Sequence, residues 1–331
     1  MKKIMVLSLC LLLAAGFAVF AGGSGESGGP KPLVITLAHG APEDHCTHLG
    51  WLKVKEIIES GSQGAMKLEI HPAQQMGGDR EVTEATQIGD IQLGHTAPSV
   101  LGSFVKEFFV LDAPFLFKTR EDVYKSLDGD GGKKLLSYLD AARLKGLGYM
   151  ENGFRNLTAN KAVRSPADLR GVKVRVMESE IQILTWSSLG ANPTPMAFGE
   201  LFTALQQKTV DAQENPIEFI YMNKLHEVQS HLMTTRHLYS PVVLLANLDF
   251  YNKLTSEQKT LLDKGIAEGT AVNRKVAAEN ELKARGQMEK TVKFIELGSA
   301  ELQAFQDKMG PVYAAIRKKV ANDTLCNLFF K

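Results

Sequence analysis

Hydrophobic and polar positions change period several times along the first third of the chain. Residues 33–39 and 91–95 are short apolar runs that predict strands, and residues 66–71 alternate as a half-buried strand does. Helical spacing follows residues 33–39, from Cys46 to Glu59, and it also follows residues 66–71, through Gln87. Strands that alternate with helices at this spacing predict an α/β fold with a mainly parallel sheet covered on both faces.

A fourth strand is predicted around Arg175. Val172, Val174 and Val176 fall on one side of a period-two pattern, and β-branched residues of this kind pack well on a core. Arg175 then points away from the core near the end of the strand. The alternative is an ordinary solvated arginine.

The next segment combines prolines with an apolar stripe. Pro193 and Pro195 exclude a helix before Met196, and the spacing after Phe198 predicts a helix that ends near Gln206. A short strand is predicted at 210–212. Asn215 directly precedes Pro216, an arrangement typical of a capped helix start, so Asn215 also has a purely structural interpretation.

One very long helix is predicted in the second half of the chain. Thr255 to Gln258 form a capping signal, and no proline follows until beyond Lys290. About 35 helical residues would extend about 50 Å, which exceeds the width of one domain of this size. Such a helix must cross a domain boundary or fray at its far end.

Four motifs in this order resemble a known family. They are Gly153-Phe154-Arg155, the Lys-x-Arg-Val strand around Arg175, Pro-Thr-Pro-Met-x-Phe ending at Phe198, and Asp-x-Gln-Glu-Asn-Pro containing Asn215. Together they are similar to the organic-acid-binding substrate-binding proteins of tripartite ATP-independent periplasmic (TRAP) transporters. Weaker similarity covers nearly the whole mature chain. The sequence departs from the family pattern at Met177, where proline is common, and at Ala212, where glycine is usual.

The resemblance implies a periplasmic-binding-protein fold of two α/β lobes, with a ligand cleft between them and one long helix along both. We expect lobe I at 33–153 and 241–275, and lobe II at 154–240 and 276–331. The chain then crosses between lobes near Gly153, near Pro241 and along the long helix. Several crossings form a hinge, which suits a protein that closes on its ligand.

The N-terminal segment predicts export to the periplasm. Lys2 and Lys3 precede an apolar run from Ile4 to Phe20, and the residues before Gly22 suit signal peptidase, so residues 1–21 are expected to be a cleaved signal peptide. The alternative is a retained membrane anchor, although about 17 apolar residues span only about 25 Å. Residues 22–32 are rich in glycine and serine and predict a flexible linker.

Composition excludes several functions. Without residues 1–21 the chain has 36 basic and 37 acidic side chains, so it has no excess of positive charge to attract nucleic acid. Motifs for hydrolytic or redox chemistry are lacking, so we expect neither an enzyme nor a cofactor. Cys46 and Cys326 are left after cleavage, and whether they form a disulfide stays open.

One cluster offers possible metal ligands. Asp44, His45, Cys46 and His48 lie close together in the sequence, and two of the side chains could share a helix face. Because no matching distant ligand pair is present, we predict a solvated helix start and no metal site.

Candidate ligand contacts follow from the resemblance. Arg175 matches the arginine that holds the ligand carboxylate in the family, and a guanidinium fits a carboxylate with two parallel bonds. Glu178 or Glu180 could compete for it. The other candidates are Arg155 as an assisting arginine, Asn215 and Phe198 as pocket-lining residues, His39, Thr96 and Ala97 at strand ends, and His237 near a crossover. Structural interpretations stay open for them, namely an ion pair for Arg155, plain core for Phe198 and satisfied structural groups for the histidines.

The leading functional hypothesis is an extracytoplasmic solute-binding protein. It would capture a small organic acid and deliver it to the membrane permease subunits of a TRAP-type secondary transporter. The second hypothesis is a carrier of an apolar or lipid-like ligand that works with an accessory periplasmic protein. A secreted α/β enzyme is a third class, which the missing motifs disfavour.

Overall fold

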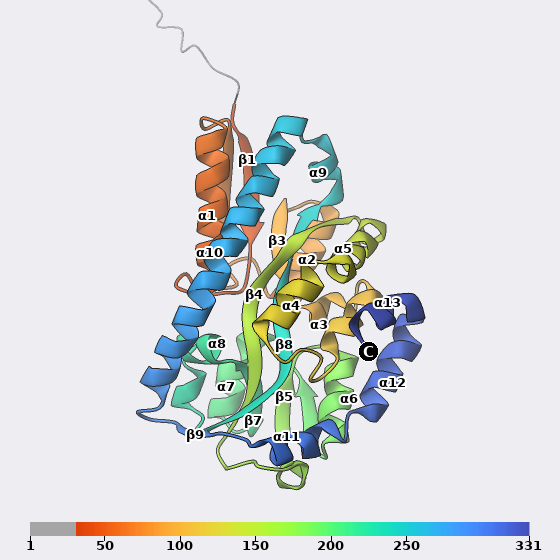
Figure 1. Cartoon of the computed structure of the whole chain (residues 1–331). Coiled ribbons are helices and arrows are strands. Elements are labelled where there is room, and N and C mark those ends of the chain that lie inside the picture. Colours follow the sequence, from red (N-terminus) through yellow and green to blue (C-terminus); the bar gives the residue numbers. More distant parts are fainter. Residues whose placement is uncertain (1–30, 331) are drawn as a thin grey trace, which may run out of the picture. The chain divides into compact units, whose positions relative to one another are not determined.

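Two long strands form the centre of the sheet in the computed structural model, which describes residues 31–330. Strand β4 (Leu144–Ala159) pairs antiparallel with β8 (His231–Asn247) over almost its whole length (Figure 1). The expected signal peptide (1–21) and all but the last two residues of the expected linker (22–32) lie outside the described residues. Within residues 31–330, every helix is too short or too polar to cross a membrane.

The remaining strands extend the sheet at opposite ends of this central pair. Strand β3 (Leu93–Thr96) pairs with the Val243–Ala246 end of β8 and continues into β1 (Leu33–Ala38) and β2 (Met66–His71). Strand β7 (Ala212–Pro216) pairs with the Arg155–Ala159 end of β4 and continues into β5 (Lys173–Val176) and β6 (Asn192–Pro195), while β9 (Lys293–Ile295) joins β8.

The prediction of a mainly parallel sheet is correct only for the outer strands. Strands β1, β2 and β3 are parallel, as are β5, β6 and β7, but the pairs β3–β8, β4–β7 and β4–β8 are antiparallel. The fold is therefore mixed α/β. Strand β7 also begins at Ala212, later than the strand expected at 210–212.

Where the sequence predicted a helix start, the structure has a helix that begins close to it. Helix α1 starts at Cys46 as expected, and a capping box at Ser165 precedes a short 3-10 segment, Pro166–Leu169. The other helices are α2 (Asp79–Ile88), α3 (Pro98–Leu101), α4 (Arg120–Leu127), α5 (Asp130–Ser137), α6 (Glu180–Ser188), α7 (Leu201–Gln206), α8 (Ile217–Met222), α9 (Leu248–Lys253), α10 (Ser256–Met288), α11 (Ser299–Gln306), α12 (Gly310–Val320) and α13 (Asp323–Phe329); α1 itself is Cys46–Gly61.

Helix α10 confirms the prediction of a long helix. Its 33 residues start at a capping box between Thr255 and Gln258. Leu262 and Ile266 pack in the hydrophobic core around β1 and α1, whereas Ala284 and Met288 pack in a separate core around α7 and α8. The helix thus joins two cores, as expected of a two-lobed fold. The exact lobe boundaries stay a prediction.

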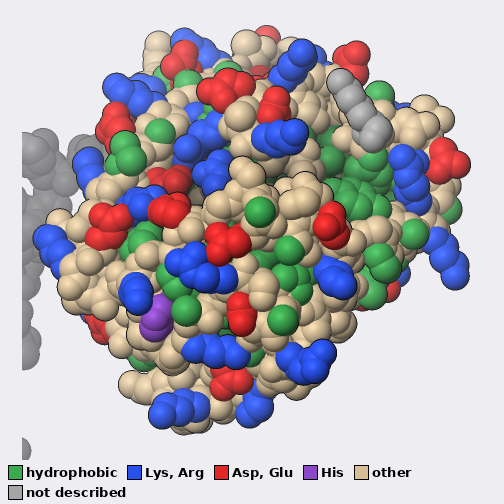
Figure 2. All heavy atoms as spheres, turned by 60° about the horizontal axis from the view of Figure 1, so that its bottom comes forward, with side chains coloured by type: hydrophobic (Ala, Val, Ile, Leu, Met, Phe, Trp, Pro, Cys, Tyr) green, Lys and Arg blue, Asp and Glu red, His purple; other side chains and the backbone are tan. Residues whose placement is uncertain are grey.

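Two further expectations concern cysteines and surface charge. Cys46 and Cys326 are both buried and free, so they form no disulfide with one another. Figure 2 shows one face of the molecule, where basic and acidic side chains are interspersed and do not gather by sign. That face matches the near-zero net charge of the sequence.

Candidate ligand-binding site

One cavity collects most of the predicted ligand contacts. It has a volume of about 780 Å³, counted to its opening into solvent. Five of the eight candidates line it: Arg175, Arg155, Asn215, Phe198 and Ala97. They come from strands β5, β4 and β7 and from the segments that follow β6 and β3, so chain segments far apart in sequence meet here.

Arg175 is buried in the wall of this cavity without a carboxylate partner. Its side chain is 2% exposed, and its Nε and Nη2 atoms donate to the Met196 carbonyl at 3.0 and 2.7 Å. The guanidinium also lies over the Phe198 ring, 5.8 Å from its centroid. Burial lowers the pKa of Arg175 to about 10, with Glu214 opposing that shift and Arg155 adding to it. The group remains a cation at neutral pH.

The two carboxylates expected to compete for Arg175 lie elsewhere. Glu178 is 3.9 Å from Arg80 Nε, and Glu180 pairs with Lys319 Nζ at 2.5 Å. Within residues 31–330, no acidic side chain comes within 4.0 Å of the Arg175 guanidinium. A desolvated cation at a cavity wall favours binding of an anion.

Arg155 differs, because an internal carboxylate neutralises it. Nη2 of Arg155 donates to Glu214 Oε1 at 2.8 Å and to the Glu214 carbonyl at 2.6 Å, and Nε donates to Oε2. His237 Nε2 lies 3.1 Å from the same Oε2. Although burial opposes ionisation, Arg155 and His237 together lower the pKa of Glu214 to about 2. Arg155 thus has the ion pair that was its structural alternative, and a ligand contact for it stays a prediction.

Asn215 lies in strand β7, so its interpretation as a helix cap is wrong. Helix α8 is preceded by Pro216 and has no side-chain cap. The Asn215 Nδ2 atom donates to Gln213 Oε1 at 2.6 Å, and the residue lies opposite Asn156 in β4. The residue therefore presents an amide at the cavity wall.

Three candidates lie behind the wall instead of lining it. His39 is stacked on His95 at 4.9 Å and has its Nε2 atom 3.1 Å from His48 Nδ1. Thr96 bonds the Asp79 carbonyl at 3.5 Å. His237 contacts Glu214 and packs edge-on against Trp186. Each has partners inside the protein, as the structural interpretation of these groups requires.

Several cavity residues lie outside the four family motifs and were not predicted from the sequence as ligand contacts. Asp79, at the start of α2, accepts a bond from Ala97 N at 2.8 Å; burial raises the pKa of its carboxyl, and the charge of Arg175 opposes this shift. His45, His95 and Asn152 also line the cavity. The Gly77-Gly78-Asp79 turn was a usable signal, because glycines before a helix let the backbone approach a ligand.

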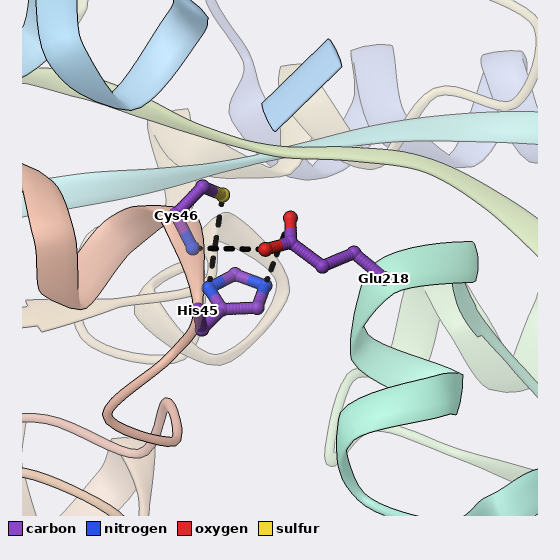
Figure 3. A group of neighbouring side chains, drawn as sticks. All are labelled: His45, Cys46 and Glu218. Atoms are coloured by element: carbon purple, nitrogen blue, oxygen red, sulfur yellow. Dashed lines mark hydrogen bonds and ion pairs between the residues drawn. The ribbon is translucent and has the colours of Figure 1, made fainter. Parts of the chain in front are cut away.

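The possible metal cluster gains a distant residue in the structure, and the prediction of a solvated helix start is wrong, because residues 45–48 are all buried. His45 and Cys46 lie next to Glu218 of α8, whereas Asp44 and His48 do not belong to the group (Figure 3). Glu218 Oε1 accepts from Cys46 N at 2.9 Å and from Asn280 Nδ2 at 2.8 Å, and Cys46 Sγ donates to the Glu151 carbonyl at 3.4 Å. Burial, with Glu218 nearby, raises the pKa of the Cys46 thiol well above its usual value. Hydrogen bonds within the chain account for most of this arrangement.

Known proteins share both this sequence pattern and this fold. The family model of the bacterial extracellular solute-binding proteins, family 7 (DctP), matches residues 37–319. The chain belongs to this family.

Relatives of the family 7 protein described here have been characterised with several acids. The present chain is 34% identical over 301 residues to the C4-dicarboxylate-binding periplasmic protein DctP of Rhodobacter capsulatus, and the match covers 89% of this chain and 90% of that protein. The sugar acid binding protein DctPAm from Advenella mimigardefordensis, in complex with galactonate, is 33% identical with a TM-score of 0.87, covering 91% of this chain and 98% of that one. A TRAP periplasmic solute binding protein from Polaromonas bound to D-erythronate is 34% identical with a TM-score of 0.86, covering 90% and 98%.

These matches confirm the resemblance and the two-lobed α/β fold expected from the sequence. Family 7 proteins are periplasmic solute-binding components of transport systems. The hypothesis of a carrier for apolar or lipid-like ligands finds no support among these relatives.

Proposed function

We propose that this family 7 protein captures a small organic acid by binding its carboxylate on Arg175. The observation that supports this most directly is the buried guanidinium at the cavity wall, held only by a backbone carbonyl. A carboxylate would supply the missing counter-charge and accept two parallel N–H bonds. Asn215 and Phe198 border the same space, so they would contact the rest of the ligand.

The proposal extends to location and partners. Removal of residues 1–21 would release the protein into the periplasm, where it would deliver its acid to the membrane permease subunits of a TRAP transporter. The relatives named above, with their dicarboxylate and sugar-acid ligands, support an acid as the cargo. The protein would release its ligand chemically unchanged.

The test begins with a thermal-shift screen of monocarboxylates, dicarboxylates, keto acids and sugar acids. An acid that binds the native state raises the melting temperature. Calorimetry with the best acid then compares the natural protein with Arg175→Ala. We expect a loss of about 3–6 kcal/mol, since two charge-assisted bonds contribute about 1.5–3 kcal/mol each.

A matched control makes the result specific. Arg164 is exposed and pairs with Glu301 away from the cavity, so Arg164→Ala removes the same charge without touching the site. Its affinity should equal that of the natural protein. Unchanged affinity in Arg175→Ala, with the fold intact, contradicts the role given to Arg175.

A further inference from the structure

A second part of the cavity wall carries neutral polar atoms without protein partners. Among the buried side-chain atoms of residues 31–330 that lack a hydrogen bond are His45 Nε2 and Asn152 Oδ1. Both residues line the cavity, and His45 is 0% exposed. A buried polar atom without a partner is unfavourable and rare in proteins, so such atoms at a cavity point to a ligand that bonds them.

The position of Asn152 follows from a break in the strand register. Glu151 pairs with Pro241 and Gly153 pairs with Ser240, which leaves Asn152 as the extra residue of a bulge in β4. Gly153 has φ +121°, a backbone conformation that favours glycine. Bulges redirect a side chain, and here the bulge turns Asn152 toward the cavity.

The protonation of the two cavity histidines follows from their partners. The Trp51 indole N–H can only donate, and it donates to His95 Nδ1 at 3.0 Å, so the proton of neutral His95 lies on Nε2. The Thr47 backbone N–H donates to His45 Nδ1 at 3.3 Å, which puts the proton of neutral His45 on Nε2 as well. Burial lowers the pKa of both rings, that of His95 to about 3. The two Nε2 atoms are therefore donors, and Asn152 Oδ1 is an acceptor.

These three groups match a hydroxyl better than they match a carboxylate. A hydroxyl donates and accepts at once, whereas a carboxylate accepts only and would meet the oxygen of Asn152. Figure 3 shows that the His45 ring faces the Glu218 carboxylate, whose Oε2 lies 3.7 Å from Nε2. Asp79, Glu81 and Glu178 line the same cavity and would repel a second anionic group.

Arg80 is the remaining cationic side chain among the described lining residues, after Arg155 and Arg175. Its Nε atom lies 3.9 Å from Glu178, and its Nη1 atom lies 3.8 Å from Glu84. Two carboxylates therefore already balance its charge, in contrast to Arg175.

We propose that His45, His95 and Asn152 form a hydroxyl-binding subsite, so that the ligand carries one carboxylate and at least one hydroxyl. This inference rests on the proposed function, because Arg175 must hold the carboxylate for the hydroxyl to reach the subsite. A site built to bond a hydroxyl rejects analogues that lack it, since its own buried groups are then left unpaired.

Calorimetry with two matched sets of acids tests the subsite. The four-carbon set is butanoate, D-erythronate and succinate, and the six-carbon set is hexanoate, D-galactonate and adipate. Within at least one set we expect the hydroxy acid to bind at least about 100-fold more tightly than both companions. Equal or tighter binding of the alkyl acid or the dicarboxylate overturns the subsite and leaves the role of Arg175 standing. If none of the six acids binds, the proposed function fails with it.

Two variants separate a direct contact from a structural effect. Asn152→Ala should weaken the hydroxy acid at least about 10-fold and leave the affinity for the alkyl acid unchanged, so the ratio of the two affinities falls. Trp51→Phe removes the donor that fixes the His95 tautomer, and it should lower the same ratio without touching the ligand. Asn327→Ala, at an exposed position of α13, is the control. A ratio that stays constant in both variants contradicts the assignment.

Discussion

Arg155 and Arg175 both reach the cavity, but their charges are balanced differently. Glu214 binds Arg155 with several hydrogen bonds, whereas Arg175 has only the carbonyl of Met196. The sequence motifs predicted both residues at the site. They could not predict which charge is neutralised, because Glu214 reaches Arg155 only through the pairing of β4 with β7.

The ion pair between Arg155 and Glu214 gives a stability prediction. Both side chains are at most 2% exposed, so Glu214→Gln leaves a buried guanidinium without its counter-charge. We expect a loss of about 3–5 kcal/mol in the free energy of unfolding, measured by urea denaturation. The double variant Arg155→Met/Glu214→Gln should recover part of that loss. A single variant within 1 kcal/mol of the natural protein would show that the pair adds little.

Asp112 gives a prediction about pH. Burial raises the pKa of its carboxyl to about 6, although the hydroxyls of Ser99 and Ser179 donate to it. The native state then binds more protons than the unfolded chain between about pH 4 and pH 6. The contribution of Asp112 to stability should therefore fall as pH rises through this window, by at most about 3 kcal/mol, while His95, whose pKa burial lowers, contributes in the opposite direction.

Denaturation at several pH values between 4 and 7 measures this effect. Asp112→Asn cannot ionise but keeps a polar group next to both serines, so its stability relative to that of the natural protein should rise with pH over that window. If the natural protein and the variant show the same pH dependence, the proton on Asp112 is not the cause.

At the scale of single elements, helix starts were easier to predict than strand partners. The caps before α10 and the 3-10 segment after Ser165 are local signals, since a side chain bonds a backbone amide three residues away. The antiparallel centre of the sheet depends on contacts between β4 and β8, which are far apart in sequence. No local pattern encodes that pairing. Asn152, His45 and His95 were missed for the same reason.

Two glycines set the distance between α1 and α10. A Cβ atom added at Gly269 would lie 2.6 Å from the Gly50 carbonyl oxygen, which is backbone and cannot turn aside. Gly269→Ala should therefore destabilise the protein by about 1–3 kcal/mol despite the better helix propensity of alanine. Chemical denaturation measures the change.

Gly286 in the same helix provides the control. A Cβ atom there would meet no atom within 4 Å, so Gly286→Ala should be neutral or stabilise by up to about 1 kcal/mol. Equal effects of the two substitutions would mean that close approach of the helices is not what requires Gly269.

At the scale of the whole molecule, β4, β8 and α10 each extend through both parts of the fold around the cavity. Three continuous elements between the two parts are the connection that a hinge needs, and they differ from a flexible linker. The family resemblance predicted these crossings from the sequence. Hydrophobic periodicity alone predicted the elements but not their order in the sheet.

Hydrogen exchange tests whether a bound acid contacts both walls. With ligand at 100 times its dissociation constant, exchange should slow by up to about 100-fold in the segments around Asp79 and around Met196, which line the cavity from the start of α2 and from the segment after β6. Helix α12 contributes no residue to the cavity and serves as the internal control. Protection on one wall alone would argue against a ligand held between them.

The most direct test of the account is a crystal structure of the protein with its bound acid. The account predicts the ligand carboxylate on Arg175, with two parallel N–H···O bonds of about 2.7–2.9 Å. A ligand carboxylate that binds elsewhere, with Arg175 still held only by the Met196 carbonyl, would contradict it.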